Sequence, residues 1–367
     1  MNVPFNDLKR EYLSIKQEID AAIREVIDNT AFIKGKYLNK FEEEFAAYCN
    51  TRYAVGASSG TTALHLAMEG FGIGKGDEVI TVSHTFIGTT EPISHAGADI
   101  TFIDIDPKTY TMNPSLIEAL ITSKTKAIVV VHLYGQMADM EAILKIARKH
   151  DLIVIEDAAQ AVGARFNGNG PGFYGNAACF SFYPGKNLGA YGDGGAVVTS
   201  DEAAAMKMKM LADHGRLSKY LHDTEGYNYR LDSLQAAVLG VKLKYIDEWN
   251  GKRREVASFY NEHLKDLDMV LPEVAHNAEH IYHIYCVQVK DREFIQKRLK
   301  EKGVSSGIHY PVPLHLQPAY AHMNLGRGSL PETEQCVDLI MSLPIFPFIT
   351  ADELEHTAAT LHGILRP

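Results

Sequence analysis

One lysine of this sequence stands in a glycine-rich loop between two apolar runs. Lys186 lies in the loop Tyr-Pro-Gly-Lys-Asn-Leu-Gly-Ala-Tyr-Gly-Asp-Gly-Gly at residues 183–195, and the apolar runs cover 178–182 and 196–199. Glycines allow the backbone to turn sharply and to approach a ligand closely. A lysine held in such a loop is a candidate nucleophile for Schiff-base formation. The alternative is an ordinary solvated lysine in a surface turn.

Two adjacent carboxylates, Glu156 and Asp157, end a second apolar run that begins at Leu152. Side chains alternate along a strand, so one of the two carboxylates faces the crevice at the carboxyl ends of the strands, where open α/β sheets bind ligands. A buried carboxylate needs a cationic partner, and the protonated ring nitrogen of a cofactor would serve. The alternative is a structural aspartate that caps the next loop.

Residues 55–67 read as a strand, a Gly/Ser turn and a helix. Free N–H groups and hydroxyls at the start of a helix can hold a phosphate. A plain helix cap by Ser59 or Thr61 is the alternative.

These three segments together point to one cofactor. A phosphate site, an acid and a lysine follow in that order, and Asp157 precedes Lys186 by 29 residues. Pyridoxal 5′-phosphate (PLP) presents the three matching chemical groups. Phe86, in His84-Thr-Phe at the end of another strand, could cover the ring face, although taken alone it would be a core residue.

The absence of several other motifs argues against other kinds of chemistry. The chain has no P-loop, no dinucleotide-binding glycine motif, no G-x-S-x-G and no H-E-x-x-H. His280-x-x-His283 has the wrong spacing for one face of a strand, so we expect no metal site. The four cysteines are far apart, which argues against a disulfide framework or a zinc cluster; they are Cys49, Cys179, Cys286 and Cys336.

The elements that position these residues follow from the apolar pattern. Short apolar runs alternate with amphipathic stretches such as 114–121 and 139–150; the runs cover 78–82, 100–103, 127–133, 152–156, 178–182 and 196–199. This pattern predicts an α/β domain with a mainly parallel sheet covered on both faces. An N-terminal helix is expected near 12–29.

The alternation of short apolar runs and amphipathic stretches changes in the C-terminal part. It predicts long helices from about residue 231, strands at 281–289 and 304–310, a helix at 292–302, a proline-rich loop at 311–318 and two closing helices. The last helix begins with a capping box, Thr350-x-x-Glu353. We therefore predict a large domain over 1–245, with the N-terminal helix, and a smaller α/β domain over 246–367.

Composition limits the partners. Lys plus Arg is 36 and Asp plus Glu is 46, so the net charge is −10. This balance argues against nucleic acid as a partner. No apolar segment is long enough to span a membrane, and the N-terminus lacks the apolar run of a signal peptide. We expect a cytoplasmic protein.

Five longer motifs carry a resemblance to a known family. They are SSGTTALHLA (58–67), EDAAQA (156–161), SFYPGKNLGAYGDGG (181–195), GYNYRLDSLQAA (226–237) and HYPVPLHLQPAY (309–320). The sequence resembles the DegT/DnrJ/EryC1/StrS family of PLP-dependent nucleotide-sugar aminotransferases over nearly its whole length. The resemblance implies the type I fold of PLP enzymes and a homodimer with shared active sites.

The resemblance also implies roles for particular residues. Lys186 would bind PLP and serve as the proton carrier, with pyridoxamine phosphate formed during the cycle. Asp157 would pair with the ring nitrogen. The other implied cofactor contacts are Gly60, Thr61 and Ser181 at the phosphate, Phe86 on the ring, Gln160 at the ring hydroxyl, and Asn228 from the partner subunit.

The substrate contacts are implied by the same family. Arg230 would take the carboxylate of the amino donor, usually L-glutamate. The candidate sugar or nucleotide contacts are Tyr183, His309, Tyr310 and, from the partner subunit, Lys219. His309 and Tyr310 have an alternative role as the end of a strand packed against the cofactor.

The family subgroup is indicated by the lysine loop and by the segment 309–320, which look like those of enzymes acting on 3-keto sugars. The expected substrate is a dTDP-3-keto-6-deoxyhexose, and the product is a dTDP-3-amino-3,6-dideoxyhexose for a polysaccharide or a glycosylated natural product. The alternatives are a UDP-linked 3-keto hexuronate, a 4-keto nucleotide sugar, a PLP-dependent sugar dehydratase and a non-catalytic regulator.

Overall fold

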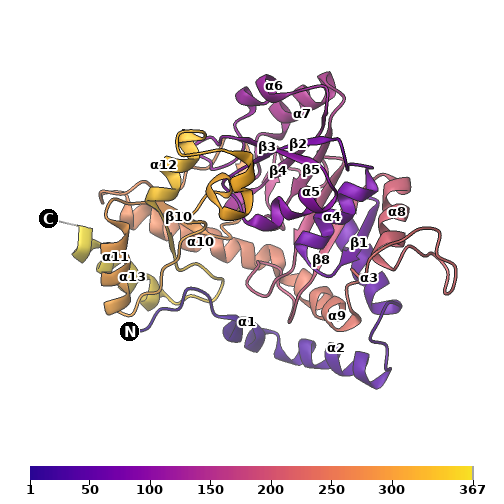
Figure 1. The fold of residues 1–367 in the computed structure, drawn as a ribbon. Helices are drawn as coiled ribbons and strands as arrows, with labels where there is room; N and C mark the ends of the chain where they lie inside the picture. Colours follow the sequence, from indigo (N-terminus) through magenta and orange to yellow (C-terminus); the bar gives the residue numbers. More distant parts are fainter. Residues whose placement is uncertain (366–367) are drawn as a thin grey trace.

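A computed structural model of the chain describes residues 1–365. Its main sheet contains β1 (Tyr53–Ala57), β2 (Glu78–Val82), β3 (Asp99–Ile103), β4 (Thr125–Val131), β5 (Ile153–Asp157), β7 (Ala177–Ser181) and β8 (Gly195–Thr199). The strand order is β1-β8-β7-β5-β4-β2-β3. Strand β8 pairs antiparallel with both neighbours, and the other pairs are parallel. The expected mainly parallel α/β fold is confirmed (Figure 1).

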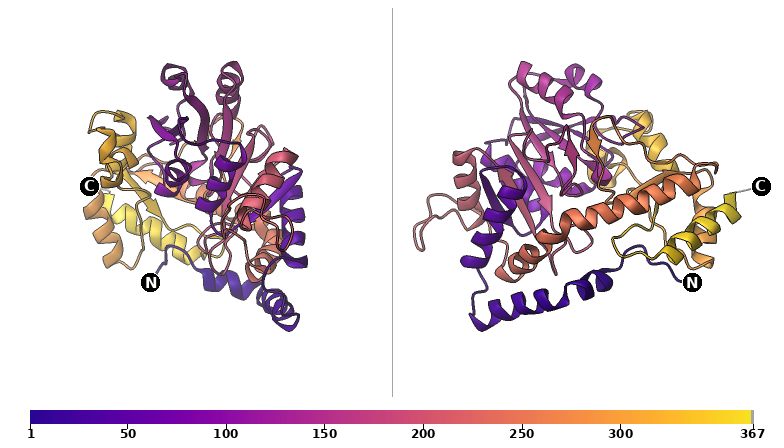
Figure 2. Two further views of the ribbon diagram at one scale, coloured as in Figure 1. Left: turned by 45° about the vertical axis from the view of Figure 1, so that its right-hand side comes forward. Right: turned by 180° about the vertical axis from the view of Figure 1, so that it is seen from behind.

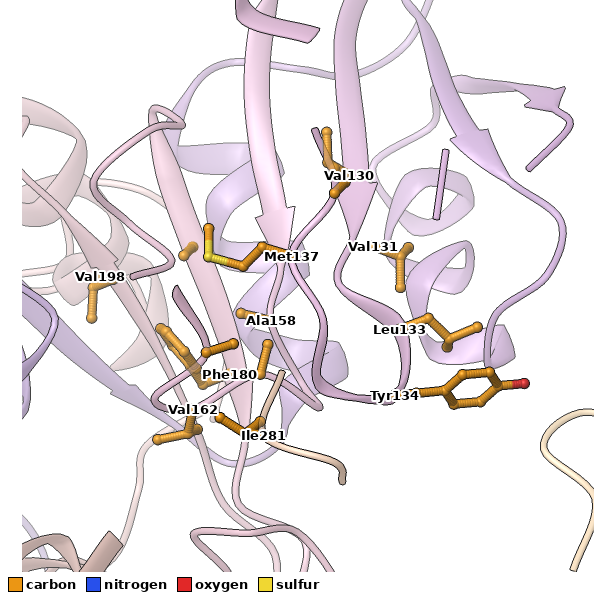
Figure 3. Close-up of a cluster of buried hydrophobic side chains, with 14 of the residues drawn as sticks. Val130, Val131, Leu133, Tyr134, Met137, Ala158, Val162, Phe180, Val198 and Ile281 are labelled. Atoms are coloured by element: carbon orange, nitrogen blue, oxygen red, sulfur yellow. The ribbon is translucent and has the colours of Figure 1, made fainter. Parts of the chain in front are cut away.

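Helices cover both faces of this sheet. They are α3 (Lys36–Tyr48), α4 (Gly60–Gly70), α5 (Glu91–His95), α6 (Ile117–Leu120), α7 (Met140–Lys149), α8 (Glu202–Ala212) and α9 (Ser233–Lys242). Helices α3, α7 and α9 pack on one face and α4, α5 and α8 on the other. Because side chains alternate along a strand, Val154 and Phe180 enter the first core and Ile155 and Cys179 the second. Figure 3 shows part of the first core.

The C-terminal part begins with α10 (Ile246–Leu264), which runs lengthwise along the molecule in the right view of Figure 2. It continues with β10 (Tyr285–Gln288), α11 (Arg292–Glu301), α12 (Pro331–Leu339), β11 (Ile340–Leu343) and α13 (Ala351–Leu365). The short strands β6 (Arg165–Phe166) and β9 (Ala278–Glu279) link it to the rest. Ile246 packs in the sheet core, whereas Tyr260 and Leu264 pack in the C-terminal core. The division at residues 245 and 246 stays a prediction, since α10 contributes to both cores.

The N-terminal segment lies beside both parts. Its expected single helix is divided at Ile15 into α1 (Leu8–Ser14) and α2 (Lys16–Asp28), which run along the lower edge in Figure 1. Of all helices in residues 1–365, none is long and apolar enough to cross a membrane.

Several C-terminal expectations need correction. Residues 304–310 do not form a strand: only single bridges join Val304 to Val3 and Gly307 to Ser342. The strand expected at 281–289 begins only at Tyr285, because Tyr282 has a positive φ of 47°. Strand β11 was not predicted, since it follows α12 directly. The capping box is confirmed, with Glu353 Oε2 accepting from the Thr350 N–H at 2.9 Å.

Candidate active site

A pocket of about 640 Å³ opens where β4, β5 and β7 end. Most predicted site residues line it, from elements far apart in the sequence: Gly60, Thr61, Phe86, Asp157, Gln160, Ser181, Tyr183, Lys186, His309 and Tyr310. The carboxyl ends of parallel strands meet at one edge of a sheet, and this is where ligands of such sheets bind.

Lys186 lies in this pocket and not in a solvated surface turn. Its backbone N–H donates to the carbonyl of Tyr183 at 2.8 Å, which closes a tight turn after β7. Burial lowers the pKa of Lys186 from 10.5 to about 8, and the negative charge of Asp157 opposes this shift. A lysine with a lowered pKa supplies a neutral amine near physiological pH, as a nucleophile or a base requires.

Asp157, and not Glu156, is the carboxylate that faces the pocket. Its Oδ2 accepts from Thr89 Oγ1 at 2.7 Å, and its Oδ1 accepts from the Ala159 N–H at 3.1 Å. Burial raises the pKa of Asp157, and these two hydrogen bonds oppose the rise. A buried carboxylate held by neutral donors is stabilised by a cation placed beside it, so the site fits a protonated ring nitrogen.

Glu156 points to the opposite face of the sheet. It accepts from the N–H groups of Gly172 at 3.0 Å and Gly175 at 2.8 Å, and it pairs with His132 Nε2 at 2.8 Å. These contacts hold the turn before β7, so Glu156 has a structural role.

The start of α4 fits a phosphate. Ser59 caps this helix and accepts from the Thr62 N–H at 3.1 Å. Within residues 1–365, the N–H groups of Gly60 and Thr61 find no acceptor. A Cβ at Gly60 would lie 2.7 Å from Ser181 Cβ, so only glycine lets β7 approach the helix this closely. The Ser59 cap and the two N–H groups without acceptors therefore lie side by side, so this helix start fits an anion such as a phosphate.

Aromatic and amide side chains surround the rest of the pocket. Phe86 is 55% exposed and lies 5.6 Å from the ring of Tyr310, so it is not a core residue. Gln160 accepts from the Tyr134 N–H at 2.6 Å and donates to the Tyr310 hydroxyl at 3.3 Å. Tyr183 is 60% exposed.

His309 is held from two sides. Its Nδ1 lies 2.9 Å from Ser342 Oγ, and its ring stacks on Phe5 with centroids 5.5 Å apart. Burial and the charge of Lys186 lower the pKa of His309 to about 4, so the ring is neutral. The strand expected at His309 and Tyr310 is absent, and both side chains line the pocket instead.

Three predicted residues do not line the pocket of their own chain. Arg230 binds the buried carboxylate of Asp213, which also holds Lys34 at 2.6 Å and Arg216 at 3.2 Å. Asn228 forms a backbone bridge with Asp213, and the Lys219 ammonium lies 5.2 Å from the ring of Tyr220. The contacts predicted for Asn228 and Lys219 across a subunit interface stay predictions, and so does the predicted contact of Arg230 with the carboxylate of the amino donor.

Sequence reasoning missed several pocket residues. Thr89 orients Asp157 but stands in no motif. Phe5 and Asn6 reach the pocket from the N-terminus. His283 and Arg253 also line it. No group of three or more His, Cys, Asp or Glu side chains in residues 1–365 is arranged to hold a metal ion.

Comparison with known proteins identifies the chain's relatives. Residues 13–362 match the DegT/DnrJ/EryC1/StrS aminotransferase family. The chain is 45% identical to a Geobacillus stearothermophilus protein named pleiotropic regulatory protein, over 100% of this chain and 99% of that one. It is also 45% identical to a Streptomyces venezuelae dTDP-3-amino-3,4,6-trideoxy-α-D-glucose transaminase, over 95% of this chain and 92% of that one.

The chain is also similar in structure to solved aminotransferases. The crystal structure of S. venezuelae DesV, in complex with a ketimine intermediate, superposes with a TM-score of 0.98 at 43% identity. The superposition covers 100% of this chain and 99% of DesV.

Proposed function

The chain belongs to the DegT/DnrJ/EryC1/StrS aminotransferase family and is a PLP-dependent sugar aminotransferase; from this premise we propose that it aminates C3 of a dTDP-linked 3-keto-6-deoxyhexose, with L-glutamate as donor. The observation that carries the proposal is the convergence of Lys186, Asp157 and the start of α4 on one pocket. The C3 position is supported by the S. venezuelae relative, whose name places the amino group at C3 of a dTDP sugar.

Each residue of the pocket would have a separate role in the reaction. When bound, PLP supplies an electron sink for the charge that develops at the donor's α-carbon. Lys186 would hold the cofactor through Nζ and, once free, accept the α-proton of the donor at the same atom. Asp157 would keep a proton on the ring nitrogen, with Thr89 fixing its orientation. In the second half of the cycle, Lys186 would return a proton to C3 of the sugar.

The phosphate would be held by neutral donors. The free N–H groups of Gly60 and Thr61 point from a helix N-terminus, and Ser181 adds a hydroxyl beside them. The partial positive charge of the helix start favours an anion there.

Product analysis tests the substrate. The enzyme is incubated with L-glutamate and with dTDP-3-keto, dTDP-4-keto and UDP-3-keto hexuronate sugars in turn, and the products are identified by mass spectrometry. We expect an amino sugar and 2-oxoglutarate only with the dTDP-3-keto sugar, and none with Lys186→Ala. Amination of the 4-keto sugar alone would overturn the C3 assignment, and loss of water without nitrogen transfer would identify a dehydratase.

We also propose a homodimer with shared active sites. Apolar side chains are exposed close to the residues that do not reach their own pocket: Phe32 is 44% exposed, Leu217 61% and Leu221 65%. An ion pair of 2.6 Å between Lys34 and Asp213 joins the segment of Phe32 to the start of the connection that carries Leu217 and Leu221. An exposed apolar patch of this kind marks an interaction site.

Complementation tests the shared site. Lys186→Ala and Asn228→Ala are each expected to be inactive, because each removes one contact from every site of its own dimer. After mixing and subunit exchange, about a quarter of the wild-type activity should return, because half of the randomly paired dimers are mixed and carry one intact site of two. Activity no higher than the sum of the two variants would contradict the shared site.

The remaining proposals concern the location of the protein in the cell and the use of its product. All four cysteines are free and buried, which suits a reducing compartment, and we infer a cytoplasmic location. The amino sugar would be passed to a glycan or a glycosylated natural product.

A further inference from the structure

The connection that follows β2, residues 83–90, carries several of the side chains that form the pocket. Those that line the pocket are Thr85, Phe86, Gly88 and Thr89. Its only regular structure is the short 3-10 turn η1 (Ile87–Thr89). Contacts at the two ends of this connection therefore determine where its side chains lie relative to Asp157.

Two threonine hydroxyls of the connection form a directed chain to Asp157. Thr89 Oγ1 donates to Asp157 Oδ2 at 2.7 Å, and this bond uses the single hydroxyl proton of Thr89. Thr85 Oγ1, which lies 2.8 Å from Thr89 Oγ1, must therefore be the donor to Thr89. Both threonines are buried, and hydrogen bonds in series strengthen one another. The bond on Asp157 thus depends on the position of the whole connection.

The first end of the connection is held by the motif 309–320. The carbonyl of Ser83 accepts from the Leu314 N–H at 3.0 Å, and Ser83 Oγ accepts from the His315 N–H at 3.0 Å. The ring of His315 adds a second contact, with Nδ1 at 2.8 Å from Ser83 Oγ. His315 Nε2 lies 3.1 Å from Glu334 Oε1, so α12 fixes the ring from the other side. Ser83 is 0% exposed and His315 is 1% exposed.

The second end is held by another residue of the same motif. The hydroxyl of Thr90 donates to the carbonyl of Ile87 at 3.0 Å, so the hydroxyl of Tyr320 must be the donor to Thr90 Oγ1 at 2.6 Å. Thr90 directly follows Thr89 and is completely buried. Tyr320 is fixed in turn, because its ring packs in a buried apolar cluster that includes Phe102.

We propose that His315 and Tyr320 are positioning residues for Asp157: they hold the two ends of the connection 83–90 in place, and Thr89 thereby keeps its hydrogen bond to the carboxylate. This gives the second half of the motif 309–320 a role, beside the pocket contacts of His309 and Tyr310. The proposal rests on the proposed role of Asp157, but it is tested in the cofactor-free protein.

Two tyrosine variants separate positioning from a general loss of stability. Tyr320→Phe removes only the hydroxyl that holds Thr90. Tyr260→Phe is the matched control, because Tyr260 is also buried and its hydroxyl donates to the carbonyl of Pro344 at 2.9 Å in the C-terminal core. Each variant loses one buried hydrogen bond of a tyrosine, so both should be destabilised to a similar degree in thermal unfolding. Only Tyr320 is connected to Asp157.

The pKa of Asp157 reports on the hydrogen bond from Thr89. Burial raises this pKa and the bond from Thr89 opposes the rise, so a weaker bond should raise the pKa further. The cofactor-free protein is labelled with ¹³C at its aspartate carboxyl groups and titrated by NMR, and the signal of Asp157 is the one missing from Asp157→Asn. The charged or titratable groups that act on Asp157 are Lys186 and His132, and neither is altered in the variants tested.

We expect Thr89→Val to raise the pKa of Asp157 by about one pKa unit, because the charged form loses one hydrogen bond. Tyr320→Phe should raise it by at least about half as much. The double variant should show no larger rise than Thr89→Val alone, because both changes act on the same bond. Tyr260→Phe should leave the pKa unchanged. An unchanged pKa in Tyr320→Phe, an equal rise in Tyr260→Phe or additive rises in the double variant would each overturn the proposal.

Ser83→Ala tests the other end of the connection without altering Tyr320. It removes the oxygen that meets both the N–H and the ring of His315, and it should also raise the pKa of Asp157. A wild-type pKa in folded Ser83→Ala would contradict the role of His315. Failure of the aminotransferase assay would leave these titrations standing, so the two proposals fail separately.

Discussion

Replacing Lys186 with methionine should stabilise the cofactor-free protein below pH 8. The pKa of Lys186 falls from 10.5 to about 8 on folding, because burial disfavours the ammonium. At 1.36 kcal/mol per pKa unit, the cost of keeping this charge in the fold is at most about 3 kcal/mol. Water in the pocket reduces the cost, so we expect Lys186→Met to gain about 2 kcal/mol at pH 7.

The pH dependence distinguishes this cause from simple repacking. Between pH 8 and 10.5 the unfolded chain binds more protons at Lys186 than the folded one, so the stability of the wild type rises with pH across this window. Lys186→Met lacks that rise, and its advantage should disappear by pH 10.5.

The assay is urea unfolding of both proteins without cofactor at pH 7, 8, 9 and 10. Lys145→Met, which removes an exposed lysine, is the control and should not change the pH dependence. Parallel stability curves for the wild type and Lys186→Met would refute the reasoning.

Three further predictions concern the surroundings of Lys186. Asp157→Asn should reduce kcat/KM by at least about a hundredfold, because it removes the negative charge that faces the cofactor ring. Thr89→Val should reduce kcat/KM by about tenfold, because it removes one hydrogen bond to Asp157. Wild-type kinetics in Thr89→Val would contradict the orienting role of Thr89. Gly60→Ala should weaken cofactor binding and cost about 1 to 3 kcal/mol of stability, because the added Cβ would lie 2.7 Å from Ser181 Cβ. Fluorescence titration measures the cofactor affinity, and urea unfolding measures the stability. Glu156→Leu should cost about 3 kcal/mol in urea unfolding by leaving buried donors unpaired, and cofactor affinity of the folded protein should be retained.

The sequence could place two carboxylates at a strand end but could not choose between them. Alternation states only that Glu156 and Asp157 face opposite sides. The choice depends on which helices cover which face, and this is a tertiary property: Asp157 follows Ile155 toward α4, and Glu156 follows Val154 toward α7.

His283 shows a different limit. Its spacing from His280 does not predict its place in the pocket, because the residue that holds its Nδ1 at 3.0 Å, Asn187, is 96 residues away in the sequence. Asn187 directly follows Lys186 in the sequence, and this is the one local link between His283 and the lysine loop. The strand expected at 304–310 failed for a related reason: an extended apolar pattern does not show whether a partner strand is available.

The position of the proposed cofactor residues around one pocket could be predicted better, because local chemistry constrains them. A glycine where β7 meets α4, a lysine in a tight turn and a strand-end carboxylate each follow from backbone geometry. Lys219, Asn228 and Arg230 came only from family resemblance, and one chain does not show where they act.

The absorbance spectrum of the purified enzyme with PLP tests the central claim most directly. We predict a Schiff-base band that L-glutamate abolishes and that a dTDP-3-keto-6-deoxyhexose restores, with no such band in Lys186→Ala. A band that no keto sugar restores would contradict the sugar aminotransferase assignment, and the absence of any band in the PLP-supplied wild type would contradict the role of Lys186.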